Sequence, residues 1–257
     1  MRLAYSDLGC LGEPIVILHG LFGSSKNWVT IAKKFSTSNR VLMLDLPNHG
    51  ASDWTEIIDY EQMSNIISEF LVEHDLEGTT ILGHSMGGKV AMTMALKQPE
   101  LIGRLIVVDI APVAYDHDNL SIITALENVD LTSIKTRNDA DKQLIKSIPE
   151  KIMRSFLLQN LVYGDYHYEW RINIPVLKKS LSNLQGFPAF SENMFFDRPT
   201  LFLAGTRSDF IQQKDHKKIA NFFPRSSIVE IADAGHWLHA DNPKGVISAV
   251  THFVSST

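Results

Sequence analysis

The feature that most constrains the fold of this chain is an alternation of two hydrophobic patterns. Six short apolar runs recur along the chain, and most of them lack polar alternation, which is typical of strands buried on both faces of a parallel sheet. These runs cover 15–18, 41–44, 80–82, 105–108, 200–203 and 228–231. Between these runs lie segments in which apolar residues recur at helical spacing, over about 27–36, 61–74, 86–98, 212–222 and 243–253. The alternation predicts an α/β fold with a mostly parallel, doubly wound sheet.

One long segment interrupts this alternation. Between Pro112 and Pro199, helical patterns follow one another without a convincing strand. They cover about 119–129, 138–147, 150–162 and 174–184. A chain of 257 residues suits one large core with an insertion. We therefore predict a core formed by residues 1–112 and 199–257, with residues 113–198 inserted as a helical cap.

Composition excludes several classes of protein. The net charge of -5 provides no basic field for a nucleic-acid backbone, so we expect no nucleic-acid partner. Cys10 is the only cysteine, which excludes an intrachain disulfide and a thiolate zinc cluster and suits a reducing compartment. No apolar stretch of about 18 residues is present. We expect a cytoplasmic chain without a membrane partner, and the sequence gives no indication of its oligomeric state.

A candidate nucleophile lies in the sequence Gly83-His84-Ser85-Met86-Gly87. This G-x-S-x-G pattern follows a strand-like run and precedes a helical one, which is the context that a nucleophile elbow requires. The glycines permit a tight turn that exposes the serine Oγ, and the helix N-terminus favours developing negative charge. An ordinary Gly/Ser turn is the alternative. The context favours Ser85 as the nucleophile.

A candidate general base follows the last strand-like run, at His236 in Ala234-Gly235-His236-Trp237. A serine nucleophile needs a base, and the order Ser, acid, His along the chain is the one found in this architecture. His239 would complete an H-x-x-H pair. We expect no metal site, because no third ligand is evident and catalytic zinc needs about three.

The loop after the first long apolar run, Gly20-Leu21-Phe22-Gly23, is a candidate oxyanion hole. Its backbone N–H groups, together with that of Met86, would stabilise negative charge on a carbonyl oxygen. Leu21 is the preferred donor and Phe22 the second choice. A flexible loop without a role is the alternative interpretation.

Two aspartates are candidates for the acid of the triad, the carboxylate that orients the base. Asp109 closes the run 105–108, with no helix beginning there for it to cap. Asp209 follows the next strand, which is the more usual position of the acid. However, Asp209 and Gln212 also read as a capping box that opens the helix near 212–222, which gives Asp209 a structural role. We favour Asp109 and keep Asp209 as the alternative.

Taken together, these motifs resemble the α/β-hydrolase superfamily over nearly the whole chain. Within it they are similar to the bacterial esterase YbfF group and its mitochondrial abhydrolase relatives. The motifs that carry this resemblance are His19 to Ser24, Asn48-His49-Gly50, Gly83 to Lys89, Val108 to Val113 and Ala234 to Trp237. The resemblance implies a cofactor-free carboxylesterase or thioesterase with a helical cap, Ser85 as nucleophile and His236 as base. It also favours Asp109, because Asp109-Ile110-Ala111-Pro112 belongs to the pattern of the group.

The substrate side of the prediction rests on aromatic and basic residues. Residues 163–196 are rich in aromatic side chains, which would line an apolar acyl pocket or else form the core of the cap. We assign Tyr163, Trp170, Phe22 and Trp237 to substrate binding. A second segment carries six bases against three acids and would attract the phosphates of coenzyme A, or else form a solvated helix face. Its bases are Lys135, Arg137, Lys142, Lys146, Lys151 and Arg154.

We therefore expect a serine hydrolase that cleaves carboxylic esters or acyl-CoA thioesters of small to medium acyl chains through an acyl-serine. Two alternatives stay open. One is a cofactor-free lyase or synthase of the menaquinone-pathway type, in which no acyl-enzyme forms. The other is a non-catalytic ligand receptor on the same fold, because one fold hosts many functions.

Overall fold

A single seven-stranded sheet organises the chain in the computed structural model, which describes residues 1–191 and 193–256. Its strands are β1 (Tyr5–Leu8), β2 (Ile15–Leu18), β3 (Val41–Leu44), β4 (Thr79–His84), β5 (Ile102–Val108), β8 (Thr200–Gly205) and β9 (Ser226–Ile231). They lie in the order β1-β3-β2-β4-β5-β8-β9, and every neighbouring pair is parallel except β1 with β3. This confirms the predicted mostly parallel, doubly wound sheet.

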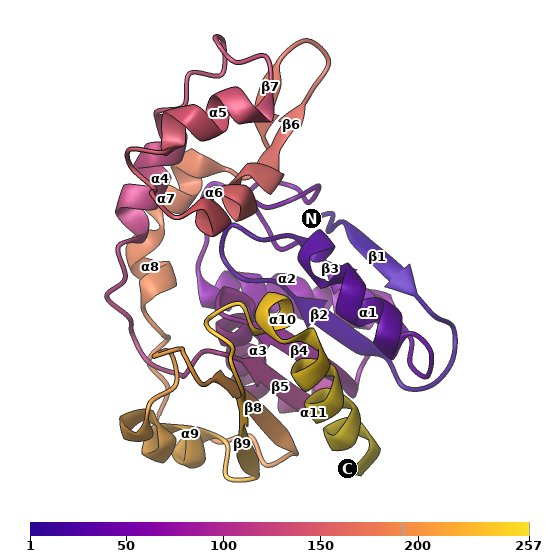
Figure 1. The fold of residues 1–257 in the computed structure, drawn as a ribbon. Coiled ribbons are helices and arrows are strands. Elements are labelled where there is room, and N and C mark those ends of the chain that lie inside the picture. Colours follow the sequence, from indigo (N-terminus) through magenta and orange to yellow (C-terminus); the bar gives the residue numbers. More distant parts are fainter. Residues whose placement is uncertain (192, 257) are drawn as a thin grey trace.

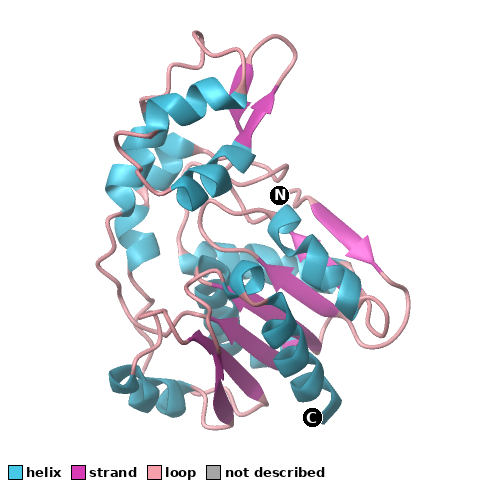
Figure 2. Ribbon diagram, viewed as in Figure 1, coloured by secondary structure: helices cyan, strands magenta, loops and turns pink. Residues whose placement is uncertain are grey.

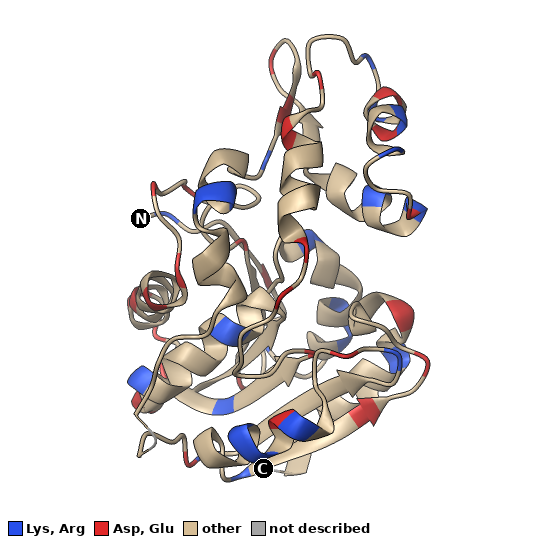
Figure 3. Ribbon diagram, turned by 90° about the vertical axis from the view of Figure 1, so that its left-hand side faces the viewer, with Lys and Arg blue, Asp and Glu red and all other residues tan. Residues whose placement is uncertain are grey.

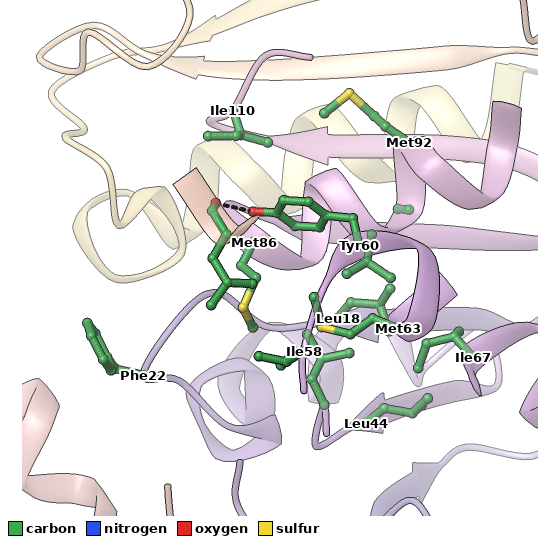
Figure 4. Close-up of a cluster of buried hydrophobic side chains, with 14 of the residues drawn as sticks. Leu18, Phe22, Leu44, Ile58, Tyr60, Met63, Ile67, Met86, Met92 and Ile110 are labelled. Carbon is green, nitrogen blue, oxygen red and sulfur yellow. Dashed lines mark hydrogen bonds between the residues drawn. The ribbon is translucent and has the colours of Figure 1, made fainter. Parts of the chain in front are cut away.

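Helices cover both faces of the sheet because successive strand residues point to opposite sides. In β2, Ile15 and Ile17 pack with α1 (Val29–Phe35) and α11 (Pro243–Ser256), in one hydrophobic cluster. Val16 and Leu18 belong to the other cluster, with α2 (Tyr60–Glu73), α3 (Met86–Lys97) and α9 (His216–Phe222). Figures 1 and 2 show this layering, and Figure 4 shows part of the second cluster between α2, α3 and the strands.

Strand β1 was not anticipated by the hydrophobic pattern. It pairs antiparallel at the edge of the sheet, with Tyr5 opposite Leu44, and its residues are largely exposed. An exposed edge strand needs no apolar run, so periodicity gives no signal for it. Short helical turns complete the core: η1 (Ser25–Trp28), η2 (Pro99–Leu101), η4 (Gln213–Asp215) and α10 (Leu238–Asp241).

A second group of elements stands off the sheet, at the top of Figures 1 and 2. It contains α4 (Asn119–Glu127), α5 (Arg137–Leu144), α6 (Lys151–Leu157), η3 (Leu158–Asn160), α7 (Ile174–Lys179) and α8 (Leu181–Gln185). The expectation that this segment holds no strand is wrong, because β6 (Leu161–Tyr163) and β7 (Tyr168–Trp170) form a hairpin. Strands of three residues are too short to produce a recognisable apolar run. We propose that residues 113–198 form the cap.

The register of the parallel strands brings their carboxyl ends to one edge of the sheet. Leu18 lies opposite Gly83, His84 opposite Val108, and Val108 opposite Leu203. The loops that follow β2, β4, β5 and β8 therefore begin side by side. Ligands of open α/β sheets bind at this edge.

Candidate active site

Ser85 occupies a strained turn between β4 and α3. Its φ of 51° and ψ of -117° lie in a region that non-glycine residues rarely adopt, and its N–H donates to Val108 O at 3.0 Å. The flanking glycines are required by close approach of the backbone. A Cβ at Gly83 would lie 2.3 Å from Gly87 O, and one at Gly87 would lie 2.5 Å from Leu18 O. The turn holds Ser85 at the wall of a cavity.

His236 follows β9 and lies beside this serine. Its Nε2 is 3.0 Å from Ser85 Oγ. The imidazole stacks on the Phe210 ring at a centroid distance of 3.8 Å and an angle of 17°. His84 Nε2 donates to the His236 carbonyl at 2.8 Å. Ring stacking and the backbone hydrogen bond together hold the imidazole against Ser85.

Asp109 lies on the other side of His236, fully buried just after β5. Its Oδ2 is 2.8 Å from His236 Nδ1. Gly205 N–H donates to Asp109 Oδ1 at 2.9 Å, and the Ser208 hydroxyl donates to Oδ2. The ionised carboxylate accepts a hydrogen bond from Nδ1–H, which leaves Nε2 without a proton and able to accept the Ser85 hydroxyl proton.

Asp209 is exposed, and its side chain makes no hydrogen bond or ion pair with any described residue. The predicted capping role of Asp209 is wrong. The helical segment begins later, where Gln212 is the N-cap of η4 and its N–H donates to the Asp215 carboxylate at 2.9 Å. The structure therefore places Asp109, and not Asp209, within hydrogen-bond distance of His236.

The two candidate oxyanion donors differ from Phe22 in what their N–H groups bind. Leu21 N–H has no hydrogen-bond partner within the described part of the chain, and Met86 is the first residue of α3, where N–H groups lack a helical acceptor. Phe22 N–H instead donates to His49 Nε2 at 3.3 Å. His49 Nδ1–H donates to Pro47 O, so the imidazole is set to accept at Nε2. The N–H groups of Leu21 and Met86 are therefore both free to donate to an oxyanion.

A cavity of about 310 Å³ opens above Ser85 and His236, between the core and the cap. Its lining is mainly apolar, with contributions from Phe22, Trp28, Met153, Phe156, Phe210 and Trp237. The Phe156 and Trp237 rings lie 5.2 Å apart, so a cap helix and the loop after His236 meet at the cavity. Phe22 and Trp237 therefore lie where a substrate contact requires them.

Tyr163 and Trp170 do not line this cavity, so the structure gives no support to their predicted role in substrate binding. Tyr163 is 66% exposed on the β6–β7 hairpin and packs against Tyr168. Trp170 lies opposite Leu161 in the same hairpin and packs against the hydrophobic cluster. Two other aromatics of 163–196, Phe187 and Phe190, pack against α9, where both contact Phe222. Apolar packing, rather than substrate contact, explains this aromatic segment.

Several residues at the site were not singled out by sequence reasoning. Ser208 and Phe210 flank Asp209 in the sequence and contact Asp109 and His236. Lys89 lies within the motif that begins at Gly83, yet a lysine one turn into a helix ordinarily points to solvent. A polar residue beside the candidate acid was the available signal for Ser208.

Neither a metal cluster nor a membrane-spanning helix is found in the described residues. No group of three or more His, Cys, Asp or Glu side chains in 1–191 and 193–256 is placed to hold a metal ion. Over the same ranges, no helix combines the length and the apolar character needed to cross a membrane. His239 instead stacks on Trp28 at a centroid distance of 4.6 Å.

The fold and this constellation match a known family. Residues 13–243 match the model of the family described as alpha/beta hydrolase fold, and the chain belongs to that family. It is 40% identical over 264 residues to the sn-1-specific diacylglycerol lipase ABHD11 of Danio rerio, covering 99% of this chain and 83% of the relative. It is 31% identical over 246 residues to esterase YbfF of Escherichia coli, covering 95% and 93%. The resemblance to the YbfF group is thereby confirmed.

A solved structure described as a marine microorganism esterase has the same architecture. It superposes on this chain with a TM-score of 0.95 at 38% identity, covering 98% of this chain and 99% of that one. The similarity includes residues 113–198 as well as the sheet, because nearly all of both chains is covered.

Proposed function

We propose that this chain hydrolyses carboxylic esters of small to medium acyl chains through an acyl-serine intermediate on Ser85. The observation that carries the proposal is the continuous chain of hydrogen bonds from Asp109 through His236 to Ser85, at 2.8 and 3.0 Å, beside an apolar cavity. Relatives named as an esterase and a lipase support hydrolysis of ester bonds.

In the acylation step, His236 Nε2 takes the Ser85 hydroxyl proton while Oγ attacks the ester carbonyl carbon. The carbonyl π-electron pair moves to oxygen, and the Leu21 and Met86 N–H groups stabilise this oxyanion, each donor contributing about 3 kcal/mol. Buried Asp109 stabilises the imidazolium. The tetrahedral intermediate then expels the alcohol oxygen, which receives the proton from His236 Nε2.

In the deacylation step, water replaces the alcohol at the same position. His236 Nε2 takes one water proton, and the resulting hydroxide attacks the acyl carbonyl in the same oxyanion hole. Collapse of the second tetrahedral intermediate breaks the bond to Ser85 Oγ, which recovers its proton from His236. The free acid leaves, and the enzyme returns to its starting protonation state without a cofactor.

Acyl-CoA thioesters form a second part of the proposal, because the same steps apply to a thiol leaving group. The basic segment of the cap lends this part limited support. Figure 3 shows acidic and basic residues mixed on the cap. Buried Arg154 pairs with Asp141 at 2.7 Å and is not available to bind phosphate, whereas exposed Arg137 donates to Leu161 O through its Nε–H alone. A cytoplasmic location stays a prediction.

The test is hydrolysis of a chain-length series of p-nitrophenyl esters and acyl-CoAs by the wild type and by Ser85→Ala. We expect turnover by the wild type, loss of turnover in Ser85→Ala, and an acyl adduct on Ser85 detected by mass spectrometry with a slowly deacylated substrate. For acyl-CoA, a rate that does not depend on ionic strength would remove the basic segment from the proposal.

The rival functions give different results in the same experiment. A lyase or synthase turns over a dedicated metabolite with negligible ester hydrolysis and forms no acyl-serine. A receptor binds its ligand without turnover. Either result overturns the proposed function, provided that circular dichroism shows both proteins to be folded.

A further inference from the structure

Lys89 has an environment that the proposed mechanism does not use. It lies on α3 one turn after Ser85, and only 2% of its surface is exposed. Helical side chains lean toward the N-terminus of their helix, which directs this ammonium toward the cavity that it lines. Its Nζ donates to the carbonyls of Gln185 and Gly186, at 3.1 and 2.5 Å. No carboxylate in the described part of the chain lies within 4.0 Å of Nζ.

A buried ammonium without an anion is unfavourable, because burial removes its hydration. Burial lowers the pKa of Lys89 to about 7, and the nearby Lys218 adds to the effect. The Tyr115 ring, 4.8 Å from Nζ, and the Tyr60 ring, at 5.5 Å, offset part of this cost. An ammonium has three N–H donors and the two carbonyls use two of them, which leaves one for a group in the cavity.

Anchoring the cap does not by itself require a charge. The Tyr60 hydroxyl donates to the adjacent carbonyl, Leu184 O, at 2.5 Å (Figure 4). A neutral group therefore makes the same kind of contact next to Lys89 at no cost of charge burial. The presence of a lysine at this buried position, instead of a neutral side chain, therefore needs another reason.

A second polar group with an unused atom lies on the same wall. His117 Nε2 is buried without a hydrogen-bond partner in the described residues, and His117 lines the cavity. Its ring stacks on Tyr115, at a centroid distance of 5.5 Å, and on Phe210, at 4.4 Å. Tyr115 thus contacts both His117 and Lys89. Asp118 also lines the cavity, but it is exposed and its carboxylate caps α4 by accepting Ser121 N–H.

We propose that Lys89 Nζ and His117 Nε2 form a subsite for a carboxylate carried by the substrate, so that the enzyme prefers esters with a second, free acid group. The inference rests on the proposed function. A carboxylate matches the donors present, since one ammonium and one imidazole N–H supply two hydrogen bonds and a single positive charge. A phosphate dianion would leave uncompensated charge in an apolar cavity.

The experiment compares matched esters that differ only in one terminal group. On the acyl side, monoethyl esters of C4 to C8 dicarboxylic acids are compared with ethyl alkanoates of equal chain length, and ethanol release is measured. On the alcohol side, acetyl esters of ω-hydroxy acids are compared with acetyl esters of n-alcohols, and acetate release is measured. The readout is the ratio of kcat/KM for the charged and the neutral ester of each pair.

We expect the wild type to favour the charged ester in one of the two series, which identifies the side of the ester that carries the carboxylate. Lys89→Met should lower the ratio by about ten- to hundred-fold, because it removes a buried charge pair. His117→Phe, which keeps the stacking, should lower the ratio by roughly three- to ten-fold, as expected for one lost hydrogen bond. Lys97→Met, on the exposed end of the same helix, is the matched control and should leave the ratio unchanged.

An equal ratio in the wild type and Lys89→Met, with neutral esters still hydrolysed, overturns the subsite and leaves the proposed function intact. If Lys89→Met does not fold, the subsite is tested by comparing inhibition of the wild type by adipate with inhibition by 1,6-hexanediol. Equal inhibition by the two compounds overturns the subsite. If the wild type hydrolyses no ester, the proposed function fails. The subsite is then tested by calorimetric titration of the protein with adipate, where no binding overturns it.

Discussion

The core and the cap position their cavity residues in different ways. In the core, Ser85 and Asp109 follow adjacent strands whose register brings His84 opposite Val108. Backbone hydrogen bonds between strands about 4.8 Å apart therefore determine where the loops begin. In the cap, the cavity residues Ile122, Phe156 and Leu184 come from three separate short helices.

The difference shows which kind of residue sequence patterns can locate. A residue at the end of a parallel strand has a place that follows from the topology of the sheet. A residue on a cap helix faces the cavity only if side-chain packing rotates the helix that way. The aromatic segment 163–196 illustrates this, because its abundant rings pack among themselves and against α9 instead of lining the cavity.

The largest expected effect is on kcat, from substitution of the acid that the core places beside His236. Asp109→Asn should lower kcat by about 10³- to 10⁴-fold, because an amide neither stabilises the imidazolium nor holds the required tautomer. Asp209→Asn should change kcat less than twofold, because Asp209 is exposed and makes no hydrogen bond or ion pair with a described residue. Steady-state hydrolysis of one p-nitrophenyl ester measures both. A comparable loss in both variants would mean that strand position does not identify the acid.

An effect of intermediate size is expected on the pH dependence of stability, and it comes from Lys89, which lies where the core meets the cap. The pKa of Lys89 is about 7 in the folded protein and about 10.5 in the unfolded chain. Between these values the unfolded state binds the extra proton, so stability rises with pH through this window and is lower where Lys89 is charged in both states. We expect Lys89 to add about 2.5 kcal/mol to the free energy of unfolding between pH 7.5 and 9.5. Urea unfolding at pH 7.5 and at pH 9.5 measures this difference in the free energy of unfolding.

Lys89→Met is the control for this pH effect. The groups that face Lys89 include Tyr60 and Tyr115, whose pKa values burial raises, and His117, whose pKa burial lowers. These groups and Lys218 remain in the variant, so their contributions largely cancel in the difference. The variant should lack the Lys89 part of the rise with pH. An identical rise in both proteins would contradict a buried, destabilised ammonium.

The smallest expected effect tests the account of the cap. Phe156→Ala should lower kcat/KM for the longest ester that the enzyme accepts by about tenfold, because it removes apolar contact surface from the cavity. Tyr163→Ala, on the exposed hairpin, should change the same constant less than twofold. The chain-length series measures both. A larger loss in Tyr163→Ala would mean that the hairpin folds over the cavity when substrate binds.

Sequence patterns located most of the sheet and much of the candidate site. All six predicted strands are present, and in five of them burial on both faces leaves the continuous apolar runs that periodicity detects, whereas β9 is a largely exposed edge strand. The same method gave no signal for β1, which is exposed, or for the hairpin of β6 and β7, whose strands are short. The preference for Asp109 over Asp209 agrees with the contact to His236, but the capping role that supported it does not exist, because Gln212 and not Asp209 begins the next helical segment.

The sequence by itself determined the parallel sheet, the turn that carries Ser85 and the place of His236 after the last strand. Each depends on local rules: double burial of strands, glycine at close backbone contacts, and loops at the carboxyl edge. Only the tertiary structure decided that Asp109 meets His236, that Phe22 N–H is already bound by His49, and that Lys89 is buried beneath the cap. These contacts join residues far apart in the chain, and their partners depend on how whole elements pack.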